Sequence, residues 1–171
     1  MSEFQKLALE RFSCRKFSDA SVDNALIEKV LKIALAAPTA VNKQPFRIWV
    51  LSGDVAQRFA EHNPYHFGVK TFILVGTSAE EAWVRRYDQQ NFANVDGAII
   101  ATHIMLALAD CGLKTCWVAS FDAPAVHEVL PETAAYNLIA AFPVAWPAED
   151  AQPSASHTKS RSYDELVHHL S

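Results

Sequence analysis

The longest apolar pattern in the chain runs from Asn91 to Cys111 (NFANVDGAIIATHIMLALADC), and it predicts a helix. Apolar residues fall on nearly every side of this helix, which is typical of a helix inside a protein or between two subunits. Within it, the longest apolar stretch, Gly97–Ala109, is interrupted by Thr102 and His103 and is too short to cross a bilayer. We therefore expect a central, buried or interfacial helix and no membrane-spanning segment.

The remaining segments alternate irregularly between helical and extended patterns. Amphipathic helices are predicted at Glu3–Arg11, Val22–Ala37 (capped by Ser21), Asp54–Glu61, Ala123–Leu130 and Asp164–Leu170. Strands are predicted at Phe46–Leu51, Thr71–Val75, Thr115–Val118 and Leu138–Trp146, the last as a central strand. This order predicts an α+β fold with helices packed on a mixed sheet. With 171 residues, the chain is expected to form one domain over residues 1–171.

The net charge and the cysteine content indicate which kinds of partner and which cellular compartment to expect. The net charge of −4 argues against general attraction to nucleic acid or to an anionic membrane surface. The opening MSEFQKLALERFS lacks the uncharged apolar core of a signal peptide. Three cysteines without a secretory signal are typical of reduced thiols. We expect a cytoplasmic protein.

An unusual loop, APTAVNKQPFRIWV, joins the second predicted helix to the first strand. Pro38 is expected to end the helix, and Pro45 to push Gln44 into an extended conformation. Between the prolines lie several hydrogen-bonding side chains: Thr39, Asn42, Lys43 and Gln44. Two interpretations are open: the loop recognises a polar planar ligand, or it caps its own backbone.

Two basic clusters stand out in this acidic chain. In RFSCRKF, Arg11, Ser13 and Arg15 alternate and share one face of an extended segment, and Lys159 and Arg161 repeat this spacing in HTKSR. If the clusters converge they suit a phosphate dianion; otherwise they are solvated basic edges. The five glycines allow neither a GxGxxG turn nor a Walker loop, so side chains would have to hold a phosphorylated cofactor.

Conventional catalytic and metal-binding patterns find little support. Pro64 separates His62 from His66, and Cys111 and Cys116 lack a second pair at zinc spacing. No GxSxG motif is present. His103 is expected to be a hydrogen-bonded core histidine. In GLKTCWVASFD, the amides near Ala119 and Ser120 either face a ligand or belong to an ordinary buried strand end.

Four of these stretches, in this order, resemble the FMN-dependent nitroreductase family, in a short, single-domain form. RFSCRKF is similar to the family's R-x-S-x-R segment, and APTAVNKQPFR to its A-P-[ST]-x-x-N-x-Q-P-[WF]-R loop. NFANVDGAIIATHIMLALADCGLKTCWVASF resembles its long helix followed by the G-x-x-x-C-W-[VI]-G-x-F turn. HTKSRSYDELV is similar to its closing K-x-R segment. The resemblance extends over nearly the whole chain.

The resemblance implies a nitroreductase-like fold with a mainly antiparallel sheet, and a homodimer with FMN at the subunit interface. Arg11, Ser13 and Arg15 would bind the phosphate and ribityl end, joined by Lys159 and Arg161. The partner subunit would line the flavin ring with its Pro38, Thr39, Ala40 and Asn42. Asn63 would contact the ring, and the backbone of Ala119 and Ser120 would face flavin N5. The implied cofactor-binding set is Arg11, Ser13, Arg15, Pro38, Thr39, Ala40, Asn42, Gln44, Asn63, Trp117, Val118, Ala119, Ser120, Lys159 and Arg161.

The implied function is an oxidoreductase in which NADH or NADPH reduces FMN and an electron-poor acceptor, such as a nitroaromatic or quinone, is then reduced in a ping-pong mechanism. FMN supplies the chemistry, so no side chain is assigned as acid or base. The alternatives are a flavin-binding or carrier protein without fast turnover, and a reductive dehalogenase or flavin-fragmenting enzyme of the same family. The sequence leaves open the physiological acceptor and the choice between NADH and NADPH.

Three features depart from the family pattern. Ala119 stands where many relatives have Gly. The Gly76–Gln90 stretch is short, so we expect an open pocket, because longer relatives use this stretch to cover the substrate. The chain ends soon after Arg161, so no long C-terminal arm around a partner is expected.

Overall fold

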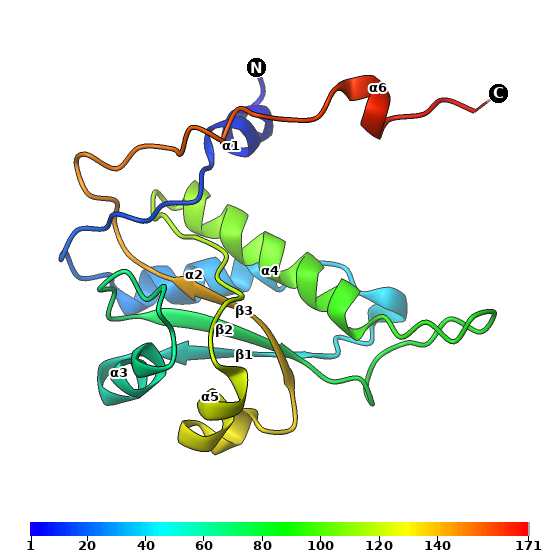
Figure 1. Ribbon diagram of the computed structural model, residues 1–171, viewed down its shortest axis with the longest axis horizontal. Coiled ribbons are helices and arrows are strands. Elements are labelled where there is room, and N and C mark those ends of the chain that lie inside the picture. The colour runs from blue at the N-terminus through cyan, green and yellow to red at the C-terminus, as the bar shows by residue number, and fades with distance from the viewer. Residues whose placement is uncertain (171) are drawn as a thin grey trace.

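A computed structural model describes residues 1–170; Ser171, the last residue of the expected domain, lies outside the described residues. A three-stranded antiparallel sheet in the order β1-β2-β3 forms its centre (Figure 1). The strands are β1 (Phe46–Leu51), β2 (Phe72–Thr77) and β3 (Asn137–Pro143). The helices are α1 (Glu3–Glu10), α2 (Asn24–Ala34), α3 (Gly53–Glu61), α4 (Ala93–Asp110), α5 (Ala123–Val129) and α6 (Tyr163–Leu166), with 3₁₀ turns η1 (Ala40–Asn42) and η2 (Pro131–Thr133). The expected α+β fold with a mainly antiparallel sheet is confirmed.

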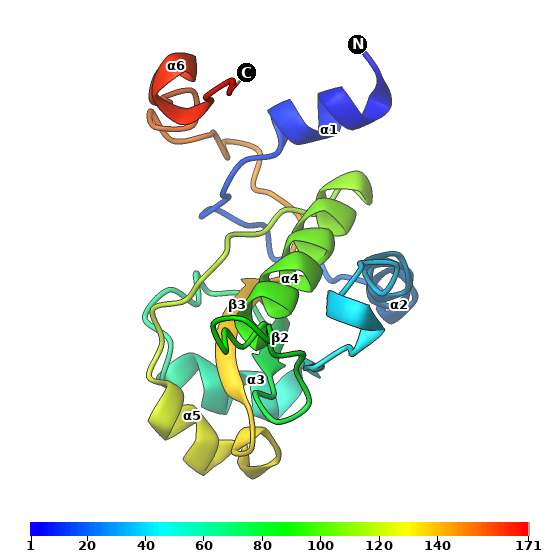
Figure 2. The same cartoon turned by 90° about the vertical axis from the view of Figure 1, so that its right-hand side faces the viewer.

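Strand β2 organises the core because both of its faces are covered. Successive side chains of a strand point to opposite faces, and all six residues of β2 are buried. Ile73 and Val75 pack in one cluster with α2 and α4, whereas Phe72 and Leu74 pack in a second cluster with α3 and α5. Figure 2 shows the sheet between these two helical layers. A strand covered on both sides reads as a continuous apolar run, which is why FILV was recognisable in the sequence.

Helix α4 spans the core and contacts α1, α2 and all three strands. Gly97 allows a close approach to the sheet, since a Cβ atom there would lie 2.3 Å from Thr77 Cγ2 and 2.6 Å from Ile139 Cδ1. No helix in residues 1–170 is long and apolar enough to cross a membrane.

The helix and strand boundaries correct several expectations. Helix α2 begins at Asn24 because the Asp23 side chain, and not Ser21, accepts a hydrogen bond from the Ala25 N–H, 3.0 Å away. The central strand is β2, and β3 lies beside it at one side of the three-stranded sheet. The last helix, α6, covers only Tyr163–Leu166.

The expected strand Thr115–Val118 is wrong. This stretch and Lys114 make only isolated bridges, to Ser13, Ala145 and Ala141. The bridges of Lys114 and Val118 share one antiparallel register along Ala141–Ala145, but no residue between them forms a bridge to that segment, so no continuous ladder forms.

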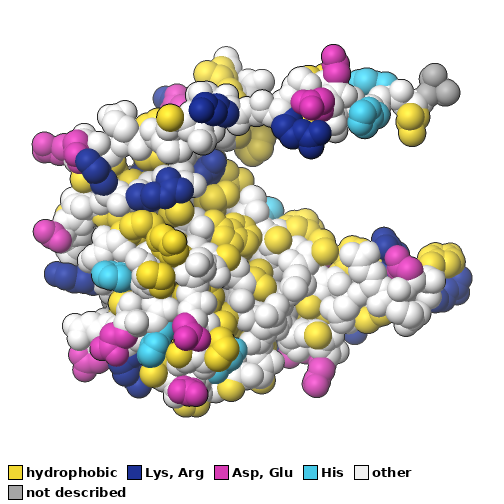
Figure 3. Space-filling model, in the orientation of Figure 1, with side chains coloured by type: hydrophobic (Ala, Val, Ile, Leu, Met, Phe, Trp, Pro, Cys, Tyr) yellow, Lys and Arg dark blue, Asp and Glu magenta, His cyan; other side chains and the backbone are white. Residues whose placement is uncertain are grey.

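Two segments project from the body and enclose a hollow between them (Figure 3). One contains α6 and follows β3; residues 152–170 are exposed except for the half-buried His157. The chain therefore ends in an exposed arm, which carries α6. The other projection lies between β2 and α4, where Val84 bridges Asn91.

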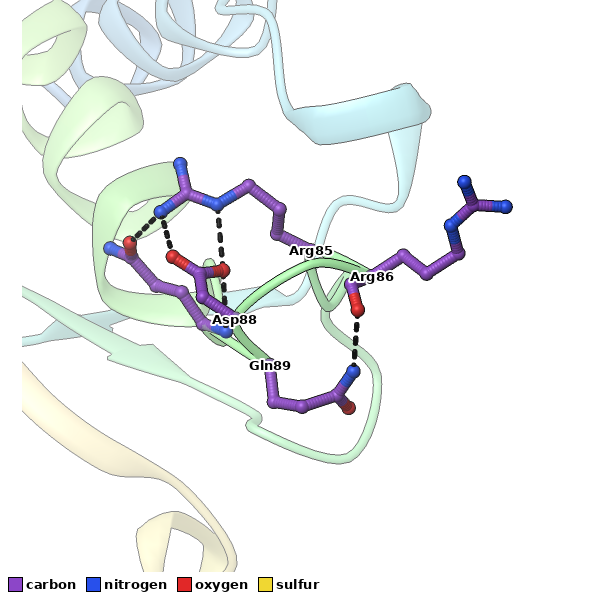
Figure 4. Close-up of polar contacts among 5 residues, drawn as sticks. Arg85, Arg86, Asp88 and Gln89 are labelled. Carbon is purple, nitrogen blue, oxygen red and sulfur yellow. Dashed lines mark hydrogen bonds and ion pairs between the residues drawn. The ribbon is translucent and has the colours of Figure 1, made fainter.

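The tip of the second projection is held by its own polar contacts (Figure 4). The Arg85 guanidinium pairs with the carboxylate of Asp88 and donates to Gln90 Oε1 at 2.6 Å. The Gln89 side chain donates to the carbonyl oxygen of Arg86 at 2.8 Å, while the Arg86 side chain points away from this cluster. The short stretch after β2 therefore forms an ordered, exposed hairpin.

Gly97→Ala is expected to lower the free energy of unfolding by about 1–3 kcal/mol, because overpacking outweighs the better helix propensity of alanine. Denaturant unfolding measures the change. Asp110→Ala is the matched control: it places alanine at an exposed position in the last turn of the same helix and should not destabilise. Equal stability of Gly97→Ala and wild type would show that the helix and sheet readily move apart.

Candidate functional site

The C-terminal end of α4 positions one part of the candidate site. Gly112, with φ of 80°, ends the helix and turns the chain into an extended segment. Ser13 and Thr115 form a parallel bridge, in which the Cys14 N–H donates to the Thr115 carbonyl at 2.9 Å. The first basic segment and the segment leading to Ala119 thus lie side by side.

An open pocket of about 210 Å³ lies where these segments meet. Its lining residues are Arg15, Tyr65, Phe67, Cys116, Trp117, Val118, Ala119 and Ser120. The Val118 N–H and C=O are both paired with Ala141. Ala119 and Ser120 are exposed, and their N–H groups donate to no backbone or side-chain acceptor in residues 1–170. The pocket wall therefore offers two free backbone donors next to Arg15; we name the pocket and these segments the amide half-site.

Asn63 adds a buried amide beside Ser120. Both residues line a neighbouring open pocket of about 630 Å³. Asn63 is fully buried, and its Oδ1 accepts from the Tyr65 N–H at 3.0 Å. Its Nδ2 has no hydrogen-bond partner in the described part of the chain. Since buried polar groups are usually paired, this donor is a notable exception.

The thiols near the site are free and largely buried. Cys14 is completely buried, and its Sγ donates to the Lys16 carbonyl at 3.1 Å. Burial raises the pKa of the Cys14 thiol, outweighing the opposing effect of this hydrogen bond. Cys116 is 7% exposed in the pocket wall. Because the thiolate is the reactive form, this environment disfavours Cys14 as a nucleophile.

The second basic cluster lies on the C-terminal arm. His157, near the start of the arm, places its Nε2 3.2 Å from the Leu9 carbonyl oxygen and its ring edge-on to Phe12. Beyond it, Lys159 and Arg161 are exposed, and Arg161 lies 3.7 Å from Glu165. The structure therefore brings the arm, but not its two cations, into contact with the first basic segment.

The Pro38–Gln44 loop lies at the other end of α4. There the Ala40 N–H donates to Asp96 Oδ1 at 2.9 Å, which ties the loop to the first turns of the helix. We name this loop and Asp96 the loop half-site. Thr39 Oγ1 accepts from the Gln44 N–H at 3.0 Å, and Gln44 Nε2 donates to Asn42 Oδ1 at 3.0 Å. The self-capping interpretation of the sequence thus describes the polar side chains of the loop.

Gln44 is not in the extended conformation expected from Pro45. Its φ is 51°, in the left-handed region. The hydrogen bond to Thr39 and the one from the Phe46 N–H to the Gln44 carbonyl, at 2.8 Å, hold this tight turn. These two hydrogen bonds outweigh the preference of a residue before proline for an extended backbone.

The two half-sites lie at opposite ends of the same helix. Helix α4 has 18 residues, so at 1.5 Å per residue it spans about 27 Å. One chain therefore does not gather both half-sites around one small ligand.

Between the half-sites, α4 leaves an apolar outer face uncovered. Val95, Ala98, Ile99 and Thr102 line this face, with His103 beside them. His103 is half-buried, and its Nδ1 lies 3.0 Å from the Ile99 carbonyl oxygen of its own helix. The histidine is hydrogen-bonded as expected, but it lies at this outer face and not in the core.

Four residues of the half-sites escaped the sequence reasoning: Asp96, Tyr65, Phe67 and Cys116. Asp96 carries a recognisable signal, because a carboxyl group in the first turns of an otherwise apolar helix needs a polar partner. Tyr65 and Phe67 carry no comparable signal, since their place in the pocket depends on contacts distant in sequence.

Solved structures share this fold. A nitroreductase family protein from Clostridium difficile 630 has a TM-score of 0.89 and 26% identity, covering 99% of both chains. A structure from Desulfovibrio desulfuricans in complex with FMN has a TM-score of 0.79 and 22% identity, covering 100% of this chain and 98% of that one. The second likeness concerns the fold alone.

A relative from Methanothermobacter thermautotrophicus, provisionally named NADH dehydrogenase/NAD(P)H nitroreductase, is 28% identical over 120 residues. The match covers 65% of this chain and 58% of that relative. The Nitroreductase family model matches residues 8–66 and 65–146, which include the amide half-site and the loop half-site. The chain belongs to the nitroreductase family.

Proposed function

We propose that this chain is an FMN-dependent oxidoreductase of the cytoplasm. It takes hydride from NADH or NADPH and reduces an electron-poor acceptor, such as a nitroaromatic or quinone, in a ping-pong mechanism. In this proposal residues 1–171 form one domain, and two copies form a homodimer with FMN at the subunit interface. Family membership, the nicotinamide in the name of the archaeal relative and the FMN in the Desulfovibrio structure support the proposal.

The observation that carries the proposal is the amide half-site. The free N–H groups of Ala119 and Ser120 and the unpaired Asn63 Nδ2 are donors, which suit the acceptor atoms along the edge of a flavin ring. Arg15, in the same pocket, suits a phosphate. FMN, when bound, supplies the hydride chemistry, while the protein positions it and excludes competing reactions. The residues present therefore fit this cofactor.

A dimer completes the site because of the direction of α4. If two copies pack their apolar α4 faces antiparallel about a two-fold axis, the N-terminal end of one helix lies near the C-terminal end of the other. The loop half-site of one subunit then approaches the amide half-site of its partner. The hollow between the two projecting segments leaves room for such a copy (Figure 3).

Arg15→Ala and Arg161→Ala are each expected to weaken FMN binding by about 1.5–3 kcal/mol, the range for a hydrogen bond to a charged group. Riboflavin, which lacks the phosphate, should bind both variants almost as it binds wild type. Flavin fluorescence titration measures both ligands.

Lys16→Ala is the matched control for Arg15→Ala, because the Lys16 ammonium is paired with Asp150 at 2.5 Å. This variant should keep wild-type affinity for both flavins. Equal losses of FMN and riboflavin in Arg15→Ala would show that the arginine supports the fold and does not bind phosphate.

Ile99→Glu is expected to prevent dimer formation and flavin binding together, since it places a charge on the apolar face of α4. Sedimentation velocity with flavin absorbance measures both. Ile33→Glu is the control, because Ile33 is 40% exposed on α2. A folded, flavin-loaded Ile99→Glu monomer at micromolar concentration contradicts the shared site.

Steady-state kinetics should give parallel lines in double-reciprocal plots as the acceptor concentration is varied, because donor and acceptor occupy the same space in turn. Intersecting lines would indicate a ternary complex.

The variants His103→Ala and Ser120→Ala, once checked for retained FMN, should each lower the turnover rate by less than the roughly 10²–10⁴-fold expected for a lost general acid or base. A larger loss in a flavin-loaded variant would assign chemistry to that side chain.

A further inference from the structure

The exposed loop half-site is held in a strained conformation. Val41 and Asn42 have φ of 45° and 57°, and Gln44 has φ of 51°. A β-branched residue at positive φ is an outlier, and such strain persists only where surrounding contacts enforce it. Packing does not enforce it at Val41, whose side chain is 70% exposed. Hydrogen bonds must therefore hold the loop.

Within the described residues, a single side-chain hydrogen bond ties this loop to the rest of the fold. Within residues 1–170, the side-chain bonds of Thr39 and Gln44 stay inside the loop, whereas Asp96 reaches it from α4, 56 residues away. On the other side, the Ser78 N–H donates to the Pro45 carbonyl at 2.9 Å. The loop is thus fixed at its end by β2 and at its start by Asp96.

The environment of Asp96 is unfavourable for stability alone. The residue is 1% exposed, and its Oδ2 is buried without a hydrogen-bond partner among the described residues. Burying a polar group with one oxygen unpaired costs free energy, so the carboxyl is not explained by core packing. Features that break such rules concentrate at functional sites.

We propose that Asp96 is a positioning residue, which holds the Pro38–Gln44 loop in the left-handed shape that receives the flavin ring. This inference rests on the proposed function. Asp96 itself touches no ligand; it fixes the Ala40 N–H and, through it, the residues that follow. A loop shaped before binding loses less conformational entropy when the ligand arrives, which raises affinity. Asp96 should then affect affinity for the ring and not for the phosphate.

The first measurement uses flavin-free, full-length protein and does not depend on the cofactor. In Asp96→Ala, amide hydrogen exchange at Ala40 is expected to be at least about tenfold faster than in wild type, since the protecting acceptor is gone. Asp96→Asn keeps an acceptor oxygen and should restore slow exchange. Asn91→Ala is the control: it removes one hydrogen bond at the start of α4 and one to the Ala79 carbonyl, neither of them to the loop, so exchange at Ala40 should be unchanged.

The second measurement compares FMN with riboflavin. Asp96→Ala should lose affinity for both by the same factor, about tenfold or more for one lost hydrogen bond, and Asp96→Asn should recover it. Ala40→Pro removes the donor of the same bond and leaves the sequence of α4 unchanged. It therefore tests the effect of this bond on flavin affinity if Asp96→Ala fails to fold. It should weaken both flavins equally.

Wild-type exchange at Ala40 and wild-type affinity for riboflavin in a folded Asp96→Ala variant would overturn the inference. Failure of Asp96→Asn to restore both would also overturn it, because a hydrogen-bond acceptor would then not be what matters. A wild-type protein that binds no flavin would overturn the proposed function and, with it, the flavin-positioning role. Exchange at Ala40 would still decide whether Asp96 shapes the loop.

Discussion

Helix α4 is apolar on nearly every side, and the position of both half-sites depends on where it can be buried. One side packs on the sheet, α1 and α2, with Gly97 setting the distance. Its first turns hold the loop half-site through Asp96, and its C-terminal end leads through Gly112 into the amide half-site. Any shift of α4 against the sheet therefore moves both. The rigidity that a binding site needs comes from packing at the core and not from the loops themselves.

Much of the fold was predictable because its signals are local. The boundaries of β1 were predicted correctly, and the buried run of β2 was recognised because both faces of that strand are covered. Prediction failed where distant segments decide the outcome. Thr115–Val118 has the composition of a strand, yet it makes only isolated bridges, to Ser13 on one side and to Ala141 on the other. At Gln44, a hydrogen bond to Thr39 overrules the preference imposed by Pro45.

Local signals predicted part of the candidate site, whereas the part that depends on distant contacts was not predicted. The order of the motifs along the chain identified candidate site residues. The structure brings two of these parts, Arg15 and the Trp117–Ser120 segment, together in one pocket. The sequence left self-capping of the Pro38–Gln44 loop open beside ligand recognition, and the structure shows that Thr39, Asn42 and Gln44 bond to one another. Asp96 signals in the sequence that it needs a polar partner, but the identity of that partner was hidden, because it lies 56 residues away. The sequence thus predicts which side chains a site contains. It does not predict where a backbone segment lies when a hydrogen bond from a distant element holds it.

In the proposed dimer, assembly, folding and ligand binding would be physically coupled. An isolated chain leaves the α4 face in water and keeps Val41 exposed at positive φ. Apolar surface removed from water contributes about 25 cal/mol per Å², so a second copy on α4 would stabilise each subunit's fold. In the proposed dimer the same contact brings the loop half-site to the amide half-site, so flavin binding and association would strengthen each other by mass action. Gly97 and Asp96, which do not line the pocket, would then also affect affinity.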